Sequence, residues 1–188
     1  VASCSYEARR FGVHSAMPMK MALRLCPQAI VLRGDMDSYS KYSGIVTDII
    51  AEEAPVYEKA SIDEFYLDLS GMDRHFGCFS WSSELRDKII RESGLPISFG
   101  LSVNKTVSKV GTGEAKPNGT KYIPNGDEKG FLAPLPVGKI PGVGDQTNKK
   151  LNFMGVRTIE TLSKIPIRLL EREFGKPGRT LWERANAI

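Results

Sequence analysis

Cysteine and histidine are scarce in this sequence, and it has no long hydrophobic run. The three cysteines, Cys4, Cys26 and Cys78, are an odd number without Cys-x-x-Cys spacing, so they predict neither a disulfide framework nor a zinc site. His14 and His75 have no second ligand at metal-binding spacing and indicate ordinary polar positions. Neither a signal peptide nor an apolar segment of membrane-spanning length is present. We therefore expect a cytoplasmic protein.

The charge of the chain is small in total but uneven in distribution. The net charge is +4, and 41% of the 188 residues are hydrophobic, enough for a packed core. Residues 1–34 carry a net +4, residues 35–124 a net −4 and residues 125–188 a net +4. An acidic middle between two basic ends suits metal-dependent chemistry between arms that hold a polyanion. The sequence opens at Val1 without a Met, so we expect a piece of a longer protein.

Hydrophobic periodicity predicts a mixture of helices and short strands, followed by helices alone. Proline and glycine mark most of the expected element ends. The expected helices are 18–26, 37–54, 81–92 and one that Asn104 caps. The expected strands are 29–32, 56–60, 65–69, 97–102 and 121–123; residues 124–127 form a linker and residues 128–188 are all helical.

Two adjacent carboxylates lie at the tip of a predicted hairpin, in Ser61-Ile62-Asp63-Glu64. Adjacent carboxylates repel each other unless a cation neutralises them, and hard cations such as Mg²⁺ prefer carboxylate oxygens. A solvated acidic turn is the alternative. Two-metal sites usually need a third carboxylate. Asp68, further along the strand, is better explained as an exposed sheet residue, so the third ligand is distant in sequence or missing.

Two short motifs carry groups suited to phosphate binding. In a helical turn, Tyr6 and Arg9 share a face, and a phenol beside a guanidinium fits a phosphate chain. On this motif alone, a surface helix with one aromatic packed inward explains the residues better. Lys116 precedes the rigid turn Pro117-Asn118-Gly119, which can aim its charge at a phosphate; an exposed turn lysine is the alternative.

A glycine- and proline-rich stretch, residues 135–144, is followed by a helix that carries Lys149. The run Pro141-Gly142-Val143-Gly144 between two short helices is typical of a helix-hairpin-helix. Its glycines let backbone N–H groups approach a DNA phosphate at a helix N-terminus, which positions a duplex without reading its sequence. An ordinary glycine-rich helical turn is the alternative.

Taken together, these motifs resemble the Y-family translesion DNA polymerases, most closely the bacterial DNA polymerase IV group. The resemblance extends over nearly the whole chain, in order. The runs that carry it are residues 6–13, 17–18, 60–69, 98–105, 116–119 and 135–144.

The resemblance implies an α+β fold with the architecture of a right hand. Residues 1–35 resemble a partial fingers domain. Residues 36–124 resemble a palm, a mixed or antiparallel sheet backed by helices, and residues 125–188 an all-helical thumb with the helix-hairpin-helix. The first palm strand of the family, with another metal-binding aspartate, would precede Val1, and the DNA-gripping little finger would follow Ile188, so both are absent here.

The activity implied is that of a DNA-directed DNA polymerase that copies damaged templates by nucleotidyl transfer with two Mg²⁺ ions. The implied partners are primer–template DNA, deoxynucleoside triphosphates and, through regions outside this sequence, the sliding clamp; a monomer is expected. The implied site residues are Asp63 and Glu64 for catalysis and metal binding, Tyr6, Arg9, Lys116, Ala2 and Ala16 for the nucleotide, and Asn104, Lys105, Gly142, Gly144 and Lys149 for DNA.

Three rival interpretations stay open at this point. A non-catalytic helix-hairpin-helix module would bind duplex DNA without needing Asp63. A nucleotide cyclase also uses paired carboxylates and Mg²⁺ but gives no reason for a helix-hairpin-helix. A polymerase fragment without its upstream strand would be inactive as it stands. Within the predicted palm, Gly111 and Gly113 are expected to weaken the helix that follows Asn104.

Overall fold

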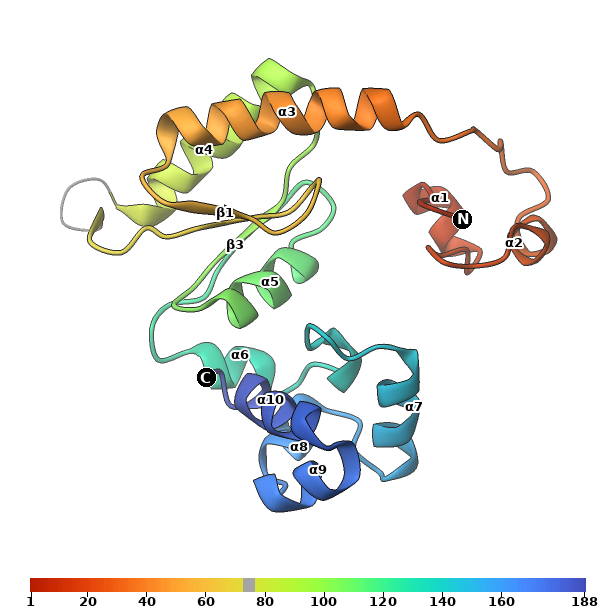
Figure 1. The fold of residues 1–188 in the computed structure, drawn as a ribbon, viewed down its shortest axis with the longest axis vertical. Coiled ribbons are helices and arrows are strands. Elements are labelled where there is room, and N and C mark those ends of the chain that lie inside the picture. The colour runs from red at the N-terminus through yellow and green to blue at the C-terminus, as the bar shows by residue number, and fades with distance from the viewer. Residues whose placement is uncertain (73–76) are drawn as a thin grey trace. The chain divides into compact units, whose positions relative to one another are not determined.

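The computed structural model describes residues 1–72 and 77–188, which form two compact units, Val1–Ser43 and Gly44–Ile188 (Figure 1). Helices predominate among the described residues and two small sheets accompany them, which confirms the predicted α+β class. The division into fingers, palm and thumb that the sequence predicts stays a prediction. His75 lies outside the described residues. None of the described helices is long and apolar enough to cross a membrane.

The first unit is built on two short helices, α1 (Tyr6–Arg10) and α2 (Met19–Leu25). Helix α1 begins after Ser5, whose hydroxyl accepts a hydrogen bond from the Ala8 N–H at 3.3 Å. Helix α2 follows Pro18, as predicted. A small core holds the unit together and consists of Val13, Met17, Ala22 and Cys26.

The strand predicted for residues 29–32 does not form, and this prediction is wrong. Ile30 and Leu32 are 88% and 84% exposed, and no described strand pairs with the segment. A strand needs a neighbour whose backbone groups accept and donate its hydrogen bonds. A run of apolar residues predicts the extended shape but cannot supply that neighbour.

In the second unit, an antiparallel hairpin packs against two long helices. Its strands are β1 (Tyr57–Lys59) and β2 (Phe65–Leu67), as the sequence predicts. Helix α3 (Met36–Glu53) runs into this unit, and α4 (Cys78–Ser93) begins one turn earlier than predicted. Their shared core consists of Val46, Ile49, Ile50, Ala54, Leu85 and Ile89, with Phe65 and Leu67 packed against it.

A second sheet pairs β3 (Phe99–Leu101) with β4 (Thr120–Tyr122) in parallel, and α5 (Lys105–Glu114) makes the crossover. Helix α5 lies directly on β3. A Cβ on Gly100 would stand only 2.3 Å from the Ser108 carbonyl oxygen, and the Cβ position of Gly111 is 3.5 Å from the Gly100 Cα. Helix α5 continues through Gly111 and Gly113, and the missing side chain of Gly111 permits the close packing on β3.

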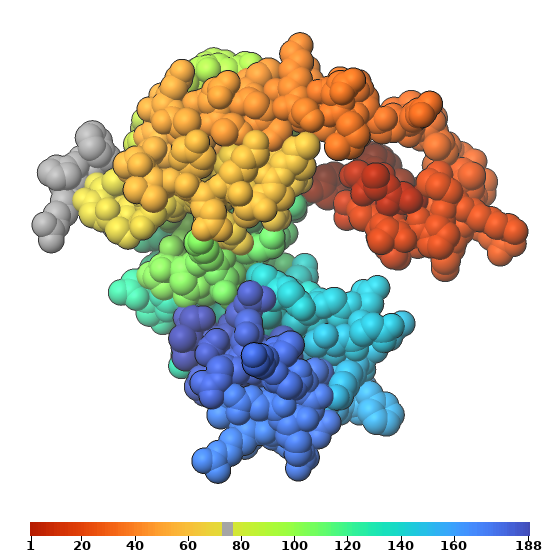
Figure 2. Space-filling view, in the orientation of Figure 1, coloured from red at the N-terminus to blue at the C-terminus, as the bar shows by residue number. Residues whose placement is uncertain are grey.

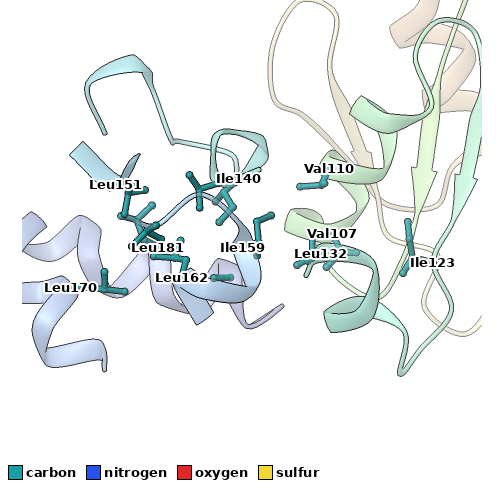
Figure 3. Packing of buried hydrophobic residues seen from close by; sticks show 13 residues of the cluster. Val107, Val110, Ile123, Leu132, Ile140, Leu151, Ile159, Leu162, Leu170 and Leu181 are labelled. Carbon is teal, nitrogen blue, oxygen red and sulfur yellow. The ribbon is translucent and has the colours of Figure 1, made fainter. Parts of the chain in front are cut away.

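Residues 125–188, called the thumb segment here, are helical as predicted. The elements are α6 (Glu128–Leu132), the 3₁₀ helix η2 (Val137–Lys139), α7 (Asp145–Phe153), α8 (Ile159–Ser163), α9 (Ile167–Phe174) and α10 (Lys176–Ala185). Their core is the largest of the described residues, and Figure 3 shows Leu151, Leu162 and Leu181 close together and Leu132 beside Val107. Val107 and Val110 of α5 belong to the same cluster, which joins the thumb segment to the β3–β4 sheet.

Candidate active site

The two carboxylates of the hairpin tip are both exposed to solvent. The tip is tight, because the N–H groups of Ala60 and Ser61 both donate to the Glu64 carbonyl oxygen, at 2.9 and 3.2 Å. The Ser61 hydroxyl also donates to Asp63 Oδ1 at 2.8 Å. The backbone thus fixes the turn, and the oxygens of Asp63 and Glu64 stay accessible to a ligand.

Strand alternation gives the hairpin two different faces. Phe65 and Leu67 point into the core shared with α3 and α4. Tyr66 lies on the opposite face, and Glu58 is its partner across the ladder. Glu64 is two residues before Tyr66 and shares its face, so a row of two carboxylates and a phenol ring faces away from the α3–α4 core.

Helix α5 presents two lysines to this row, and Figure 2 shows the hairpin (yellow) at the surface beside α5 (green). Lys105 forms an ion pair with Glu58, and its amine lies 5.3 Å from the centre of the Tyr66 ring. Lys109, one turn later, donates to Glu64 Oε2 at 2.6 Å. The two lysines, four residues apart on one face of α5, thus pair with Glu58 on β1 and with Glu64 just before β2.

The hairpin tip also shifts the ionisation of Lys109. The hydrogen bond to Glu64 raises the pKa of the Lys109 amine above its usual value, and the charges of Glu64, Tyr66 and Asp63 act in the same direction. Because the pKa of the Lys109 amine is raised, the contribution of its positive charge to the pair is lost as the pH rises through that pKa. Glu64 at the tip thus already holds one cation, and Asp63 adds a negative charge nearby.

The turn that carries Lys116 is fixed by groups from several elements. Asn118 adopts a left-handed conformation with φ +50°, and its carbonyl and side-chain oxygens both accept from Arg86. The Gly119 N–H donates to Ser98 Oγ at 3.2 Å. The Lys116 amine is exposed and has no ion pair or hydrogen bond with any described residue.

Four of the predicted nucleotide-binding residues lie in the first unit. Tyr6 and Arg9 share one face of α1, as predicted, with the guanidinium carbon 5.7 Å from the ring centre, and both side chains are exposed. The Ala16 N–H donates to the Val1 carbonyl oxygen at 2.9 Å, which brings the segments of Ala2 and Ala16 together. Ala2 and Ala16 are both exposed.

The predicted helix-hairpin-helix is present in the thumb segment, with η2 as its short first helix and α7 as its second. Gly142 has a positive φ of +84°, and Gly144 is the N-cap of α7 without a side-chain cap. The first N–H groups of α7 therefore have no capping side chain. Lys149 is exposed on α7.

The oxygen and the nitrogen of the Asn104 side-chain amide each form a hydrogen bond that stabilises the fold. Its Oδ1 accepts from the Val107 N–H at 3.0 Å and caps α5, as predicted. Its Nδ2 donates to the Ala187 carbonyl oxygen at 2.9 Å, which ties α5 to the end of the thumb segment. The predicted contact of Asn104 and Lys105 with a primer strand stays a prediction.

Three basic residues contact the candidate site residues or their neighbours, although the sequence predicted no role for them. The pairing of Lys109 with Glu64 depends on the strand register and on the placement of α5. Arg86 holds the turn of Lys116 from α4, and Arg184 of α10 donates to the Pro141 carbonyl oxygen beside Gly142. Each of these contacts spans 32 or more residues, so sequence spacing gave no signal.

Two family models match the chain. Residues 1–113 match the impB/mucB/samB family, and residues 138–186 match a model described as the DNA polymerase-iota thumb domain. Similar curated proteins are a DNA polymerase IV of Alkalilimnicola ehrlichii, 42% identical over 98% of this chain and 52% of its own length, and DNA polymerase IV 2 of Methanosarcina mazei, 37% identical over 100% and 51%. The chain spans about half the length of these relatives.

Solved structures agree with these matches. DinB from Sulfolobus solfataricus superposes with a TM-score of 0.89 at 28% identity, over 100% of this chain and 56% of that one. The Dbh DNA polymerase in an insertion ternary complex gives a TM-score of 0.87 at 28% identity, over 100% and 55%. The predicted polymerase-core fold is therefore confirmed, and the chain belongs to the impB/mucB/samB family of Y-family DNA polymerases.

Proposed function

We propose that the protein catalyses template-directed DNA synthesis past damaged bases, by nucleotidyl transfer to a primer. The observation that carries this proposal is the pair of exposed, adjacent carboxylates at the β1–β2 tip, in a chain that belongs to a polymerase family. The relatives named DNA polymerase IV support it. The rival cyclase leaves the helix-hairpin-helix unexplained, and the rival binding module leaves the carboxylate tip unexplained.

Asp63 and Glu64 would hold the metal ions, for which we propose two Mg²⁺. Their oxygens fit a hard cation, because they are exposed and because the tip already attracts the Lys109 amine. No third acidic, histidine or cysteine residue joins them among the described residues. The family resemblance implies that a further aspartate completes the set. When bound, the ions neutralise charge on the nucleotide and lower the pKa of the primer hydroxyl.

The residues of this chain would bind and orient the nucleotide. The triphosphate would take charge-assisted hydrogen bonds from Arg9 and Lys116 and a hydrogen bond from the Tyr6 hydroxyl, and these groups would stabilise the pyrophosphate as it leaves. The unpaired amine of Lys116 and the exposed face of α1 support these roles. Ala2 and Ala16, which bring no bulk to their shared surface, would leave room for a damaged template base.

The thumb segment would hold the duplex near its phosphates. The N–H groups at the start of α7, which no side chain caps, suit a phosphate oxygen beside Gly142 and Gly144, and Lys149 adds a positive charge on the same helix. Lys105, with Asn104, would lie near the primer strand. Because these groups contact phosphates, affinity for DNA should fall steeply as salt rises. The proposal extends to a monomeric, cytoplasmic enzyme that binds the sliding clamp through other regions.

Primer extension by the full-length protein tests this function. We expect extension that requires template, all matching deoxynucleotides and a divalent cation. Glu64→Gln should lower the rate of extension by about 10³-fold or more and leave duplex affinity unchanged. The variant would lose a ligand of the metal ion that neutralises negative charge in the transition state. Glu58→Gln, a change of the neighbouring carboxylate on the same face, is the matched control. Duplex binding without any extension by the wild-type protein would favour the binding module.

A further inference from the structure

The guanidinium of Arg86 is the most extensively hydrogen-bonded side chain near the turn of Lys116. It projects from α4 and is 16% exposed. Its Nε donates to the Ile97 carbonyl oxygen at 2.8 Å, and its Nη2 donates to the carbonyl and side-chain oxygens of Asn118, both at 2.8 Å. Nη1 binds Asp87 at 2.9 Å. One side chain thus joins α4, the residue that leads into β3 and the turn before β4.

These bonds act on a segment whose backbone has little freedom to adjust. Asn118 has φ +50°, a conformation that asparagine tolerates better than most residues. A Cβ on Gly119 would stand 2.3 Å from the Ala115 carbonyl oxygen. The Phe99 N–H donates to the Gly119 carbonyl oxygen at 3.2 Å. The chain that follows Asn118 is therefore fixed at Gly119, and Arg86 holds Asn118 itself from α4.

Lys116 differs from the other lysines between residues 44 and 124. Each of the other lysines lies against an acidic side chain, a hydroxyl or an aromatic ring of a described residue. The pairs are Lys59 with Thr47, Lys88 with Glu53, Lys105 with Glu58, Lys109 with Glu64 and Lys121 with Phe131. The amine of Lys116 has no such partner among the described residues, although its backbone is held firmly two residues away. A fixed backbone with an unpaired charge suits an external anion.

We propose that Arg86 is a positioning residue for nucleotide binding. It holds the Asn118 turn so that the Lys116 amine is presented to the triphosphate of the incoming nucleotide. This role rests on the proposed function, and it adds a residue that does not itself touch the nucleotide.

The geometry requires arginine at this position. Guanidinium is planar and carries five N–H donors, so one side chain can bind Ile97 and Asn118 at the same time. A lysine keeps the charge but presents its donors from a single nitrogen and cannot reproduce the fork. Arg86→Lys should therefore loosen the turn without removing a charge or opening a cavity in the aliphatic core.

Single-nucleotide incorporation by the full-length protein tests the proposal, with apparent Kd for the deoxynucleotide and maximal rate determined separately. Lys116→Ala should raise the apparent Kd about tenfold. Arg86→Lys should raise it about three- to tenfold and change the maximal rate less. Asn118→Gly, which keeps the backbone conformation but removes one acceptor of Arg86, should raise it about twofold. Arg91→Lys is the matched control, because Arg91 lies on the same helix with its side chain 70% exposed.

The combined variant separates positioning from a general structural effect. If Arg86 acts through Lys116, adding Arg86→Lys to Lys116→Ala should raise the apparent Kd by less than about twofold more. The proposal would be overturned if the apparent Kd of the combined variant rose by the product of the two single increases. It would also be overturned if Arg86→Lys and Asn118→Gly both left nucleotide affinity unchanged. A Lys116→Ala variant with normal nucleotide affinity would contradict the nucleotide site of the proposed function itself, and with it the role of Arg86.

Discussion

The hairpin tip and the thumb segment belong to one unit but are stabilised by different interactions. In the thumb segment, Leu151, Ile159, Leu162 and Leu170 are completely buried, and a dry aliphatic core holds the helices together. At the hairpin tip every side chain from residue 60 to residue 64 is exposed, and short hydrogen bonds and ion pairs hold it. Stability therefore comes from residues remote from the carboxylates, and the carboxylates can change charge without disturbing a core.

Removal of a core side chain in the thumb segment should have the largest effect on stability. Leu162 is 0% exposed, so Leu162→Ala should lower the free energy of unfolding by about 2–5 kcal/mol through lost burial and a residual cavity. Urea denaturation measures the change. Phe153→Ala is the control, because Phe153 is 94% exposed and should change stability by less than about 0.5 kcal/mol. Equal effects of the two variants would contradict the division of roles.

The contact of β3 with α5 should tolerate no added methyl group. Gly100→Ala would place a Cβ 2.3 Å from the Ser108 carbonyl oxygen and 2.5 Å from the Thr112 nitrogen, so the helix must move. We expect a loss of about 1–3 kcal/mol, visible as a lower Tm. Gly113→Ala on α5 meets nothing within 4 Å and should raise stability slightly, through higher helix propensity. A raised Tm in Gly100→Ala would show that the close packing is not required.

The helix-hairpin-helix contains residues that shape the fold and that we also propose to contact DNA. Gly142→Ala combines an unfavourable φ of +84° with a Cβ that would lie 2.6 Å from Arg184 Nη1. The resulting shift should weaken duplex affinity of the full-length protein about three- to tenfold, measured by fluorescence anisotropy at fixed salt. Gly130→Ala in α6, with no atom within 4 Å, is the control. Unchanged affinity in Gly142→Ala would place the DNA contact elsewhere.

The ion pair at the hairpin tip should have the smallest effect of the four. Both of its side chains are more than one third exposed, so solvent weakens the pair. Lys109→Met should lower the rate of primer extension about threefold, because Glu64 loses the amine that orients it. Its effect on Tm should lie within about 1 °C, because no core is involved. A large fall in Tm would indicate that the tip contributes to stability after all.

The sequence predicted the parts of this molecule that depend on neighbouring residues. The hairpin, its carboxylate tip, the Asn104 cap and the helix-hairpin-helix each follow from local alternation, capping or turn chemistry. Contacts between segments that are distant in the sequence could not be predicted from these local patterns. The Lys109–Glu64 pair requires the strand register and the placement of α5, and the Arg86 fork joins residues 32 apart. The segment 29–32 failed for the converse reason, because its local pattern suits a strand and no described partner pairs with it.

Two aspartates on the same hairpin allow the most direct test of the central claim. Asp63 lies at the tip, whereas Asp68 follows β2, is also exposed and accepts a hydrogen bond from the Ser70 N–H at 2.9 Å. Each can be changed to asparagine in the full-length protein, and single-turnover primer extension with Mg²⁺ gives the rate. The account predicts a loss of about 10³-fold or more for Asp63→Asn and a rate within about twofold of wild type for Asp68→Asn. Near-normal extension by Asp63→Asn would contradict the account.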